Sequence, residues 1–101
     1  MTICHTTDTT FNTDLQKEGF TLVNYWATWC APCRMLSPIL EAYDLEKQDN
    51  VRILKANVEE CIATSAHYEI MSVPTTILFK DGKEIDRAIG LLSIEALKQF
   101  I

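Results

Sequence analysis

The chain has 101 residues, of which 48% are hydrophobic and 23% charged, and its formal net charge is -5. This length is enough for one domain with its own core and excludes a second, so residues 1–101 are predicted to form a single domain. The composition is that of a globular protein. A surface for nucleic-acid phosphates would need clustered Lys and Arg, so the negative charge argues against a nucleic-acid partner.

The N-terminal segment leads to an expectation about location. It has no basic stretch followed by an apolar run, and nowhere does the chain contain the roughly 18 consecutive apolar residues of a membrane span. We therefore expect a cytoplasmic protein that does not contact membranes. Structural disulfides are rare in a reducing compartment, so a close pair of cysteines there points to catalysis or metal binding.

Four elements are predicted in the N-terminal half from runs of apolar residues and their spacing. They are a strand at Ile3–Thr6, a helix at Phe11–Lys17 that Thr10 or Asp8 caps and Gly19 ends, a strand at Phe20–Trp26, and a helix from Cys33 to Gln48. The second strand is apolar on both faces apart from Asn24, which is typical of a central strand covered on both sides. Pro38 is expected to kink the long helix.

Three strands and two helices are predicted in the C-terminal half. They are a strand at Val51–Val58, a helix at Glu59–Tyr68, a strand between Pro74 and Lys80, a strand at Lys83–Ile89 that Gly90 ends, and a helix from Ser93 to Ile101. Asp81-Gly82 is a strong hairpin signal, so the last two strands are predicted to be antiparallel. The complete order predicts an α/β protein with a central mixed sheet of about five strands, flanked on both faces by about four helices.

Two cysteines separated by two residues, Cys30 and Cys33, lie between the predicted central strand and the long helix. Sites of open α/β sheets are found at this edge, the carboxyl end of the strands. Cys30 would lie just before the first helical turn, where unpaired N–H groups and the helix dipole stabilise a thiolate, so it is the predicted nucleophile. Cys33 would be more buried and is the predicted resolving thiol. Pro32 suits the first turn because it lacks an N–H.

A zinc half-site is the alternative interpretation of such a cysteine pair, and it would need a second pair of ligands. The remaining candidates are scattered with no paired spacing: Cys4, His5, Cys61 and His67. We therefore predict that the pair binds no metal. Cys4 and Cys61 are expected to be small core residues or incidental thiols.

A wider set of residues surrounds this pair, in a consistent order along the whole chain. The set comprises Trp26-Ala27, Trp29-Cys30, Pro32-Cys33-Arg34-Met35, Pro38, Lys55, Val73-Pro74-Thr75, Phe79, Gly82 and Gly90. With these residues the sequence resembles the thioredoxin family. The resemblance implies the thioredoxin fold, with Pro74 as a cis proline facing the dithiol and the Val73 backbone pairing with an extended substrate. It also implies an apolar substrate surface formed by Trp29, Ala31, Pro32, Val73, Gly90 and Leu91.

The activity that the resemblance implies is reduction of protein disulfides by dithiol–disulfide exchange through Cys30 and Cys33, contributing to cell redox homeostasis. The oxidised pair would be recycled with electrons from NADPH through a flavin-containing thioredoxin reductase. Neither cofactor is expected to bind this chain, which lacks a glycine-rich dinucleotide fingerprint. The resemblance also leads us to expect a monomer.

Two other functions are compatible with the same features. A disulfide oxidant or isomerase shares the fold, but such relatives usually carry His inside the cysteine motif, where this chain has Ala31-Pro32. A non-catalytic docking module would use the apolar surface alone, and binding by itself needs no cysteines.

The sequence departs from the family pattern in its acid–base environment. Asn24 stands six residues before Cys30, where most members carry a buried aspartate that assists proton transfer at the second cysteine. Lys55, the usual neighbour of that aspartate, then lacks its carboxylate partner. We expect slower deprotonation of Cys33, together with a more stable protein because a buried charge is removed. Ala31 also replaces the more common glycine, and Met71 makes the substrate side more apolar.

Overall fold

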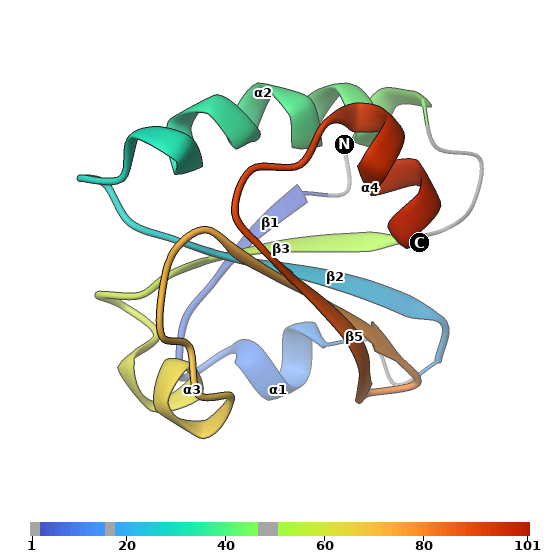
Figure 1. The fold of residues 1–101 in the computed structure, drawn as a ribbon. Coiled ribbons are helices and arrows are strands. Elements are labelled where there is room, and N and C mark those ends of the chain that lie inside the picture. Colours follow the sequence, from blue (N-terminus) through green and yellow to red (C-terminus); the bar gives the residue numbers. More distant parts are fainter. Residues whose placement is uncertain (1–2, 16–17, 47–50) are drawn as a thin grey trace.

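The computed structural model describes residues 3–15, 18–46 and 51–101, which form an α/β fold (Figure 1). Its elements are β1 (Ile3–Thr6), α1 (Phe11–Asp14), β2 (Phe20–Trp26), α2 (Ala31–Glu46), β3 (Arg52–Asn57), α3 (Ile62–His67), β4 (Thr75–Lys80), β5 (Lys83–Ile89) and α4 (Ile94–Phe100). This order confirms the predicted alternation of strands and helices. Within the described part of the chain, no helix is long and apolar enough to cross a membrane.

The five strands form one mixed sheet in the order β1-β3-β2-β4-β5. Strands β1, β3 and β2 are parallel, whereas β4 runs antiparallel to both β2 and β5. Strand β2 is therefore central, as its apolar sequence predicts, and it is buried along most of its length. Its register places Asn24 between Lys55 of β3 and Thr76 of β4.

Helices cover both faces of this sheet and enclose two apolar clusters. Figure 1 shows α2 and α4 on one face and α1 and α3 on the other. Side chains of a strand alternate between its faces, so β2 directs Leu22 toward α2 and α4 and directs Val23 and Tyr25 toward α1 and α3. This alternation also places Asn24 on the same face as Leu22, beneath α2.

The hairpin between β4 and β5 confirms the Asp81-Gly82 prediction. Both residues have positive φ, +54° and +83°, as the tight turn of a two-residue hairpin requires. The Asp81 carboxylate also accepts a hydrogen bond from the N–H of Gly19 at 2.8 Å, and the N–H of Asp81 donates to the Gly19 carbonyl at 2.9 Å. The hairpin is thereby tied to the segment that enters β2.

Thr10 takes the predicted N-cap position of α1, whereas Asp8 does not cap this helix. The Thr10 hydroxyl makes no cap hydrogen bond to α1 and accepts instead from the N–H of Thr7. The Asp8 carboxylate instead accepts from the N–H groups of Ala63 and Thr64, at 2.9 and 3.0 Å, and so caps α3 from a distant part of the chain. These hydrogen bonds lower the pKa of Asp8. A sequence pattern predicts caps from residues next to a helix, whereas the cap of α3 by Asp8 forms only in the folded chain.

Several helix boundaries also differ from prediction. Helix α1 ends at Asp14, because Leu15 already has extended backbone and packs against the apolar cluster of that face. Helix α3 begins at Ile62 rather than Glu59, because Asn57 starts a turn in which its side chain accepts from the N–H of Glu59. Helix α2 begins at Ala31, which confirms that Cys30 lies just before its first turn, and Pro38 lies inside it. The predicted helix ends at Lys17 and Gln48 fall outside the described residues.

Candidate redox site

Cys30 and Cys33 are joined by a disulfide where β2 leads into α2, with their Cα atoms 5.3 Å apart. The Cys30 carbonyl accepts from the N–H of Arg34, and the N–H of Cys30 donates to the Ala27 carbonyl. Cys30 therefore lies at the N-terminal end of α2, whose first turn contains no acidic residue. The positive end of the helix dipole acts on Cys30 without a neighbouring carboxylate in that turn.

The environments of the two sulfur atoms differ. The N–H of Cys33 donates to Cys30 Sγ at 3.2 Å, and a hydrogen bond to sulfur favours its thiolate form. Cys30 is 5% exposed and Cys33 3%, and both pack with Ala27 in a small apolar cluster against Trp26 and Val73. The geometry thus favours negative charge on Cys30 after reduction, although both cysteines are buried.

The loop before β4 faces this disulfide. The Val73-Pro74 peptide bond is cis, which confirms the isomer that the family resemblance implies. The Val73 carbonyl oxygen lies 3.5 Å from Cys30 Sγ. The Pro74 carbonyl accepts from the N–H of Gly90 at 2.8 Å, so Gly90 is brought to the same loop. Gly90 has φ of +98°, and this conformation, rather than crowding, favours glycine there.

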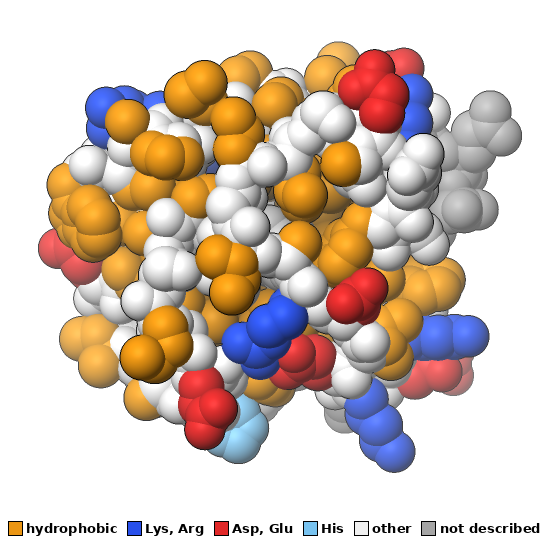
Figure 2. All heavy atoms as spheres, in the orientation of Figure 1, with side chains coloured by type: hydrophobic (Ala, Val, Ile, Leu, Met, Phe, Trp, Pro, Cys, Tyr) orange, Lys and Arg blue, Asp and Glu red, His pale blue; other side chains and the backbone are white. Residues whose placement is uncertain are grey.

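Exposed apolar side chains surround the disulfide. Trp29 is 70% exposed and Met71 90%, and Ala31 and Pro32 are also exposed. A pocket of about 180 Å³ lies beside them, lined by Trp29, Val58, Ser65, Ile70, Met71, Ser72 and Val73. Figure 2 shows hydrophobic side chains gathered over the end of the molecule where β2 leads into α2. A partner could therefore approach Cys30 over an apolar surface.

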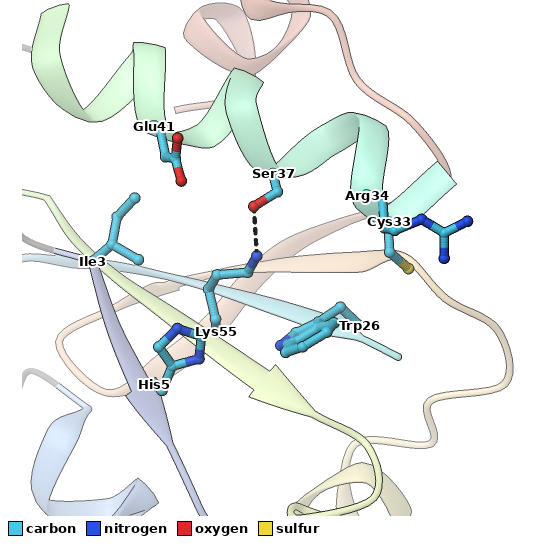
Figure 3. Close-up of a pocket in the computed structure, with 8 residues that line it drawn as sticks. All are labelled: Ile3, His5, Trp26, Cys33, Arg34, Ser37, Glu41 and Lys55. Carbon is cyan, nitrogen blue, oxygen red and sulfur yellow. Dashed lines mark hydrogen bonds between the residues drawn. The ribbon is translucent and has the colours of Figure 1, made fainter. Parts of the chain in front are cut away.

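A second pocket, of about 330 Å³, lies behind Cys33 under α2 (Figure 3). It is lined by Ile3, His5, Trp26, Cys33, Arg34, Ser37, Glu41 and Lys55. Lys55 Nζ donates to Ser37 Oγ at 2.9 Å and lies 5.0 Å from the centre of the Trp26 ring. Partial burial lowers the pKa of Lys55, and the negative charge of Glu41 opposes this shift.

Asn24 is 1% exposed and its amide donates to Thr76 Oγ1 at 3.3 Å. The amide therefore has a neutral partner across the sheet, and no charge is buried at this position. Lys55 has no carboxylate partner among the described residues, in line with the sequence prediction, but its ammonium is held by the Ser37 hydroxyl.

Sequence reasoning missed Ser37, although a signal existed. Ser37 is four residues after Cys33, so in a helix the two lie on one face. The Arg34 guanidinium donates to the Thr28 carbonyl at 2.9 Å.

The two other cysteines lie in contrasting positions. Cys4 is exposed, whereas Cys61 is buried and donates to the Thr6 carbonyl, and burial raises the pKa of its thiol. Among the described residues, no three His, Cys, Asp or Glu side chains are grouped closely enough to hold a metal ion.

Taken together, a disulfide at a helix N-terminus, a facing cis proline and an exposed apolar rim define a thiol–disulfide oxidoreductase. The family model described as Thioredoxin matches residues 2–101. A thioredoxin of Staphylococcus saprophyticus is 42% identical over 101 residues, covering all of this chain and 96% of its own. A thioredoxin of Staphylococcus aureus is 41% identical with the same coverage. The chain belongs to the thioredoxin family and is a disulfide reductase whose Cys30–Cys33 pair is the redox-active site.

Proposed function

We propose that Cys30 is the nucleophile and Cys33 the resolving thiol in the reduction of protein disulfides. The Cys30 thiolate attacks one sulfur of the substrate, forming a mixed disulfide and releasing the other substrate sulfur as a thiolate. Cys33 gives its proton to water, and the resulting thiolate attacks Cys30 Sγ. The Cys30–Cys33 bond forms, the mixed disulfide breaks, and the second substrate sulfur leaves with the electron pair. The substrate gains two electrons and the chain loses them.

One observation carries this proposal: the N–H of Cys33 donates to Cys30 Sγ at the N-terminus of α2, while Cys33 is nearly inaccessible. A nucleophile needs to be available as thiolate, whereas a resolving thiol needs to be close and protected from solvent. Both cysteines are nearly inaccessible, so the feature that supports different roles is the hydrogen bond to Cys30 Sγ, which favours the thiolate on Cys30.

Substrate docking is proposed at the rim around Cys30. The Val73 carbonyl next to Cys30 Sγ could accept a hydrogen bond from an extended substrate backbone. The contact surface would be completed by Trp29, Ala31, Pro32, Pro74 and Gly90. Main-chain pairing and apolar contact impose little selectivity for sequence, which suits a reductase with several substrate proteins.

Recycling is proposed to use NADPH electrons delivered by a flavin-containing thioredoxin reductase, with no cofactor bound by this chain. The family supports both disulfide substrates and a thioredoxin reductase as partners. We further propose that the protein works as a monomer in the cytoplasm, in cell redox homeostasis, without nucleic-acid or membrane partners.

The test is reduction of insulin disulfides coupled to NADPH consumption through a thioredoxin reductase. We expect turnover by the wild-type chain, none by Cys30→Ser, and a raised KM for Trp29→Ala. Equilibration with glutathione is the companion measurement. A pair that stays reduced in mildly reducing glutathione buffer would identify an oxidant instead, and a cellular role that survives Cys30→Ser would identify a docking module.

A further inference from the structure

The pocket behind Cys33 contains a lysine whose charge the proposed function leaves without a role. Lys55 rises from β3 into this pocket and reaches α2 through its hydrogen bond to Ser37, as Figure 3 shows. Burying an ammonium group is unfavourable unless the charge has a partner. No described carboxylate forms an ion pair with Lys55, so its position calls for an explanation.

Ser37 limits where this ammonium can lie. A lysine side chain has four rotatable bonds and is otherwise free to extend into solvent. The 2.9 Å hydrogen bond to Ser37 Oγ holds Nζ under α2, above the face of Trp26. Because Ser37 follows Cys33 by one helical turn, the bond keeps the charge beneath the same face of α2 from which Cys33 projects.

The other titratable side chains that line this pocket come from two elements. His5 is contributed by β1, and Arg34 and Glu41 by α2. Arg34 is turned to the Thr28 carbonyl and Glu41 is exposed, so both are in contact with solvent. The central strand contributes the neutral Trp26 to the described lining. Among the described side chains that line the pocket, Lys55 is therefore a partly buried cation, whereas Arg34 is exposed.

We propose that Ser37 is a positioning residue that holds the Lys55 ammonium in the pocket behind Cys33, where its positive charge stabilises the Cys33 thiolate. The inference rests on the proposed role of Cys33 as resolving thiol. In the second step the Cys33 proton passes to water, and the thiolate then attacks Cys30 Sγ as described above. In this chain the electrostatic attraction of a cation takes the place of a buried base. This attraction should partly offset the slower deprotonation of Cys33 that is expected where Asn24 replaces an aspartate.

The test measures the Cys33 thiol directly, without turnover. In a Cys30→Ser background, ¹³Cβ NMR of labelled cysteine follows the titration of Cys33 separately from Cys4 and Cys61. We expect Lys55→Met to raise the pKa of Cys33 by about one unit and Ser37→Ala by about half a unit, because an opposite charge nearby favours the thiolate. Ser37→Thr keeps the hydroxyl and should restore the original titration.

Lys80→Met is the matched control. Lys80, the last residue of β4, also lies over an aromatic ring, with Nζ 5.6 Å from the centre of the Phe20 ring. Phe20 is the first residue of β2, so this pair lies at the end of β2 away from the disulfide. Lys80→Met should leave the Cys33 titration unchanged. The proposal is overturned if Ser37→Ala has no effect on the Cys33 pKa, or if Lys80→Met shifts it as much as Lys55→Met does. Failure of the insulin assay would instead refute the proposed function, since the titration needs no substrate.

Discussion

The two faces of the sheet bury different kinds of side chain at matching positions of the same strands. Toward α1 and α3, β2 contributes Val23 and Tyr25 to an apolar cluster. Toward α2, the positions between them carry Asn24 and, on the neighbouring strand, Lys55. Threonine hydroxyls are buried on both faces, but the amide and the ammonium occur on the face that lies behind Cys33, and burying such groups is costly. The comparison indicates that one face maintains the fold and the other also supports the chemistry.

The apolar face is held together by aromatic side chains. Phe79 of β4 lies 6.3 Å from Phe11 and 5.3 Å from Tyr68, measured between ring centres, both in edge-on geometry. These contacts join the sheet to α1 and to the residue that follows α3. Burial also raises the pKa of Tyr25, which keeps its phenol neutral on this face. The face therefore contributes stability without a charge near the disulfide.

Replacing Cys33 by Ser should have the largest effect, because it removes the chemistry of one face and leaves the other intact. Turnover of insulin disulfides should fall to background, and the substrate should remain attached to Cys30 as a mixed disulfide, detected by mass spectrometry. Cys4→Ser, at an exposed cysteine, is the matched control and should keep full activity. Sustained turnover by Cys33→Ser would show that another thiol resolves the intermediate.

Phe79→Ala tests the apolar face. Removing a fully buried ring should lower the free energy of unfolding by about 3–5 kcal/mol, measured by urea denaturation. The rate of disulfide reduction per folded molecule should not change, because Phe79 lies on the face away from the pocket. Ile85→Ala, at an exposed side chain, should have little effect on stability. A loss of activity without a loss of stability would contradict the division between the two faces.

Asn24→Asp adds a carboxyl group to the face of the sheet that lies under α2, behind Cys33. The buried carboxyl should have a raised pKa, because desolvation disfavours its charge, and the neighbouring Lys55 should only partly oppose this shift. A raised pKa costs stability only above the unfolded value of about 3.9, so the loss, about 1–3 kcal/mol, should appear as the pH rises through the range from 4 to 7. The new base should also speed the second step, by at most about 100-fold. An unchanged stopped-flow rate between pH 6 and 8 would reject this role.

Asp8→Asn should have the smallest effect, since it weakens a cap of α3 on the apolar face. The lowered pKa of Asp8 means that its carboxylate stabilises the fold above the unfolded pKa, and that this stabilisation is lost as the pH falls through the lower folded value. The melting temperature of the variant should be a few degrees lower at pH 7 and should approach that of the wild type in acid. Asp14→Asn, on α1, is the control. Equal effects from both variants would point to net charge rather than to the cap.

Much of the architecture was predictable because its signals are local. The apolar run of β2 predicted a central strand, and Asp81-Gly82 predicted the hairpin, since each pattern depends only on neighbouring residues. The other strands were predicted equally well from their apolar runs. The helix boundaries were less so, because Leu15 and Asn57 end or delay a helix through contacts that spacing alone does not show.

The sequence by itself determined the order of elements, the redox pair and, through the family resemblance, the cis isomer at Pro74. Only the tertiary structure decided that Asp8 caps α3, 55 residues away, and that Ser37 holds Lys55 across 18 residues. The physical reason is that helices, strands and turns depend on near neighbours, whereas a hydrogen bond between distant residues forms only after the sheet and helices have packed. The placement of charge behind Cys33 belongs to this second kind.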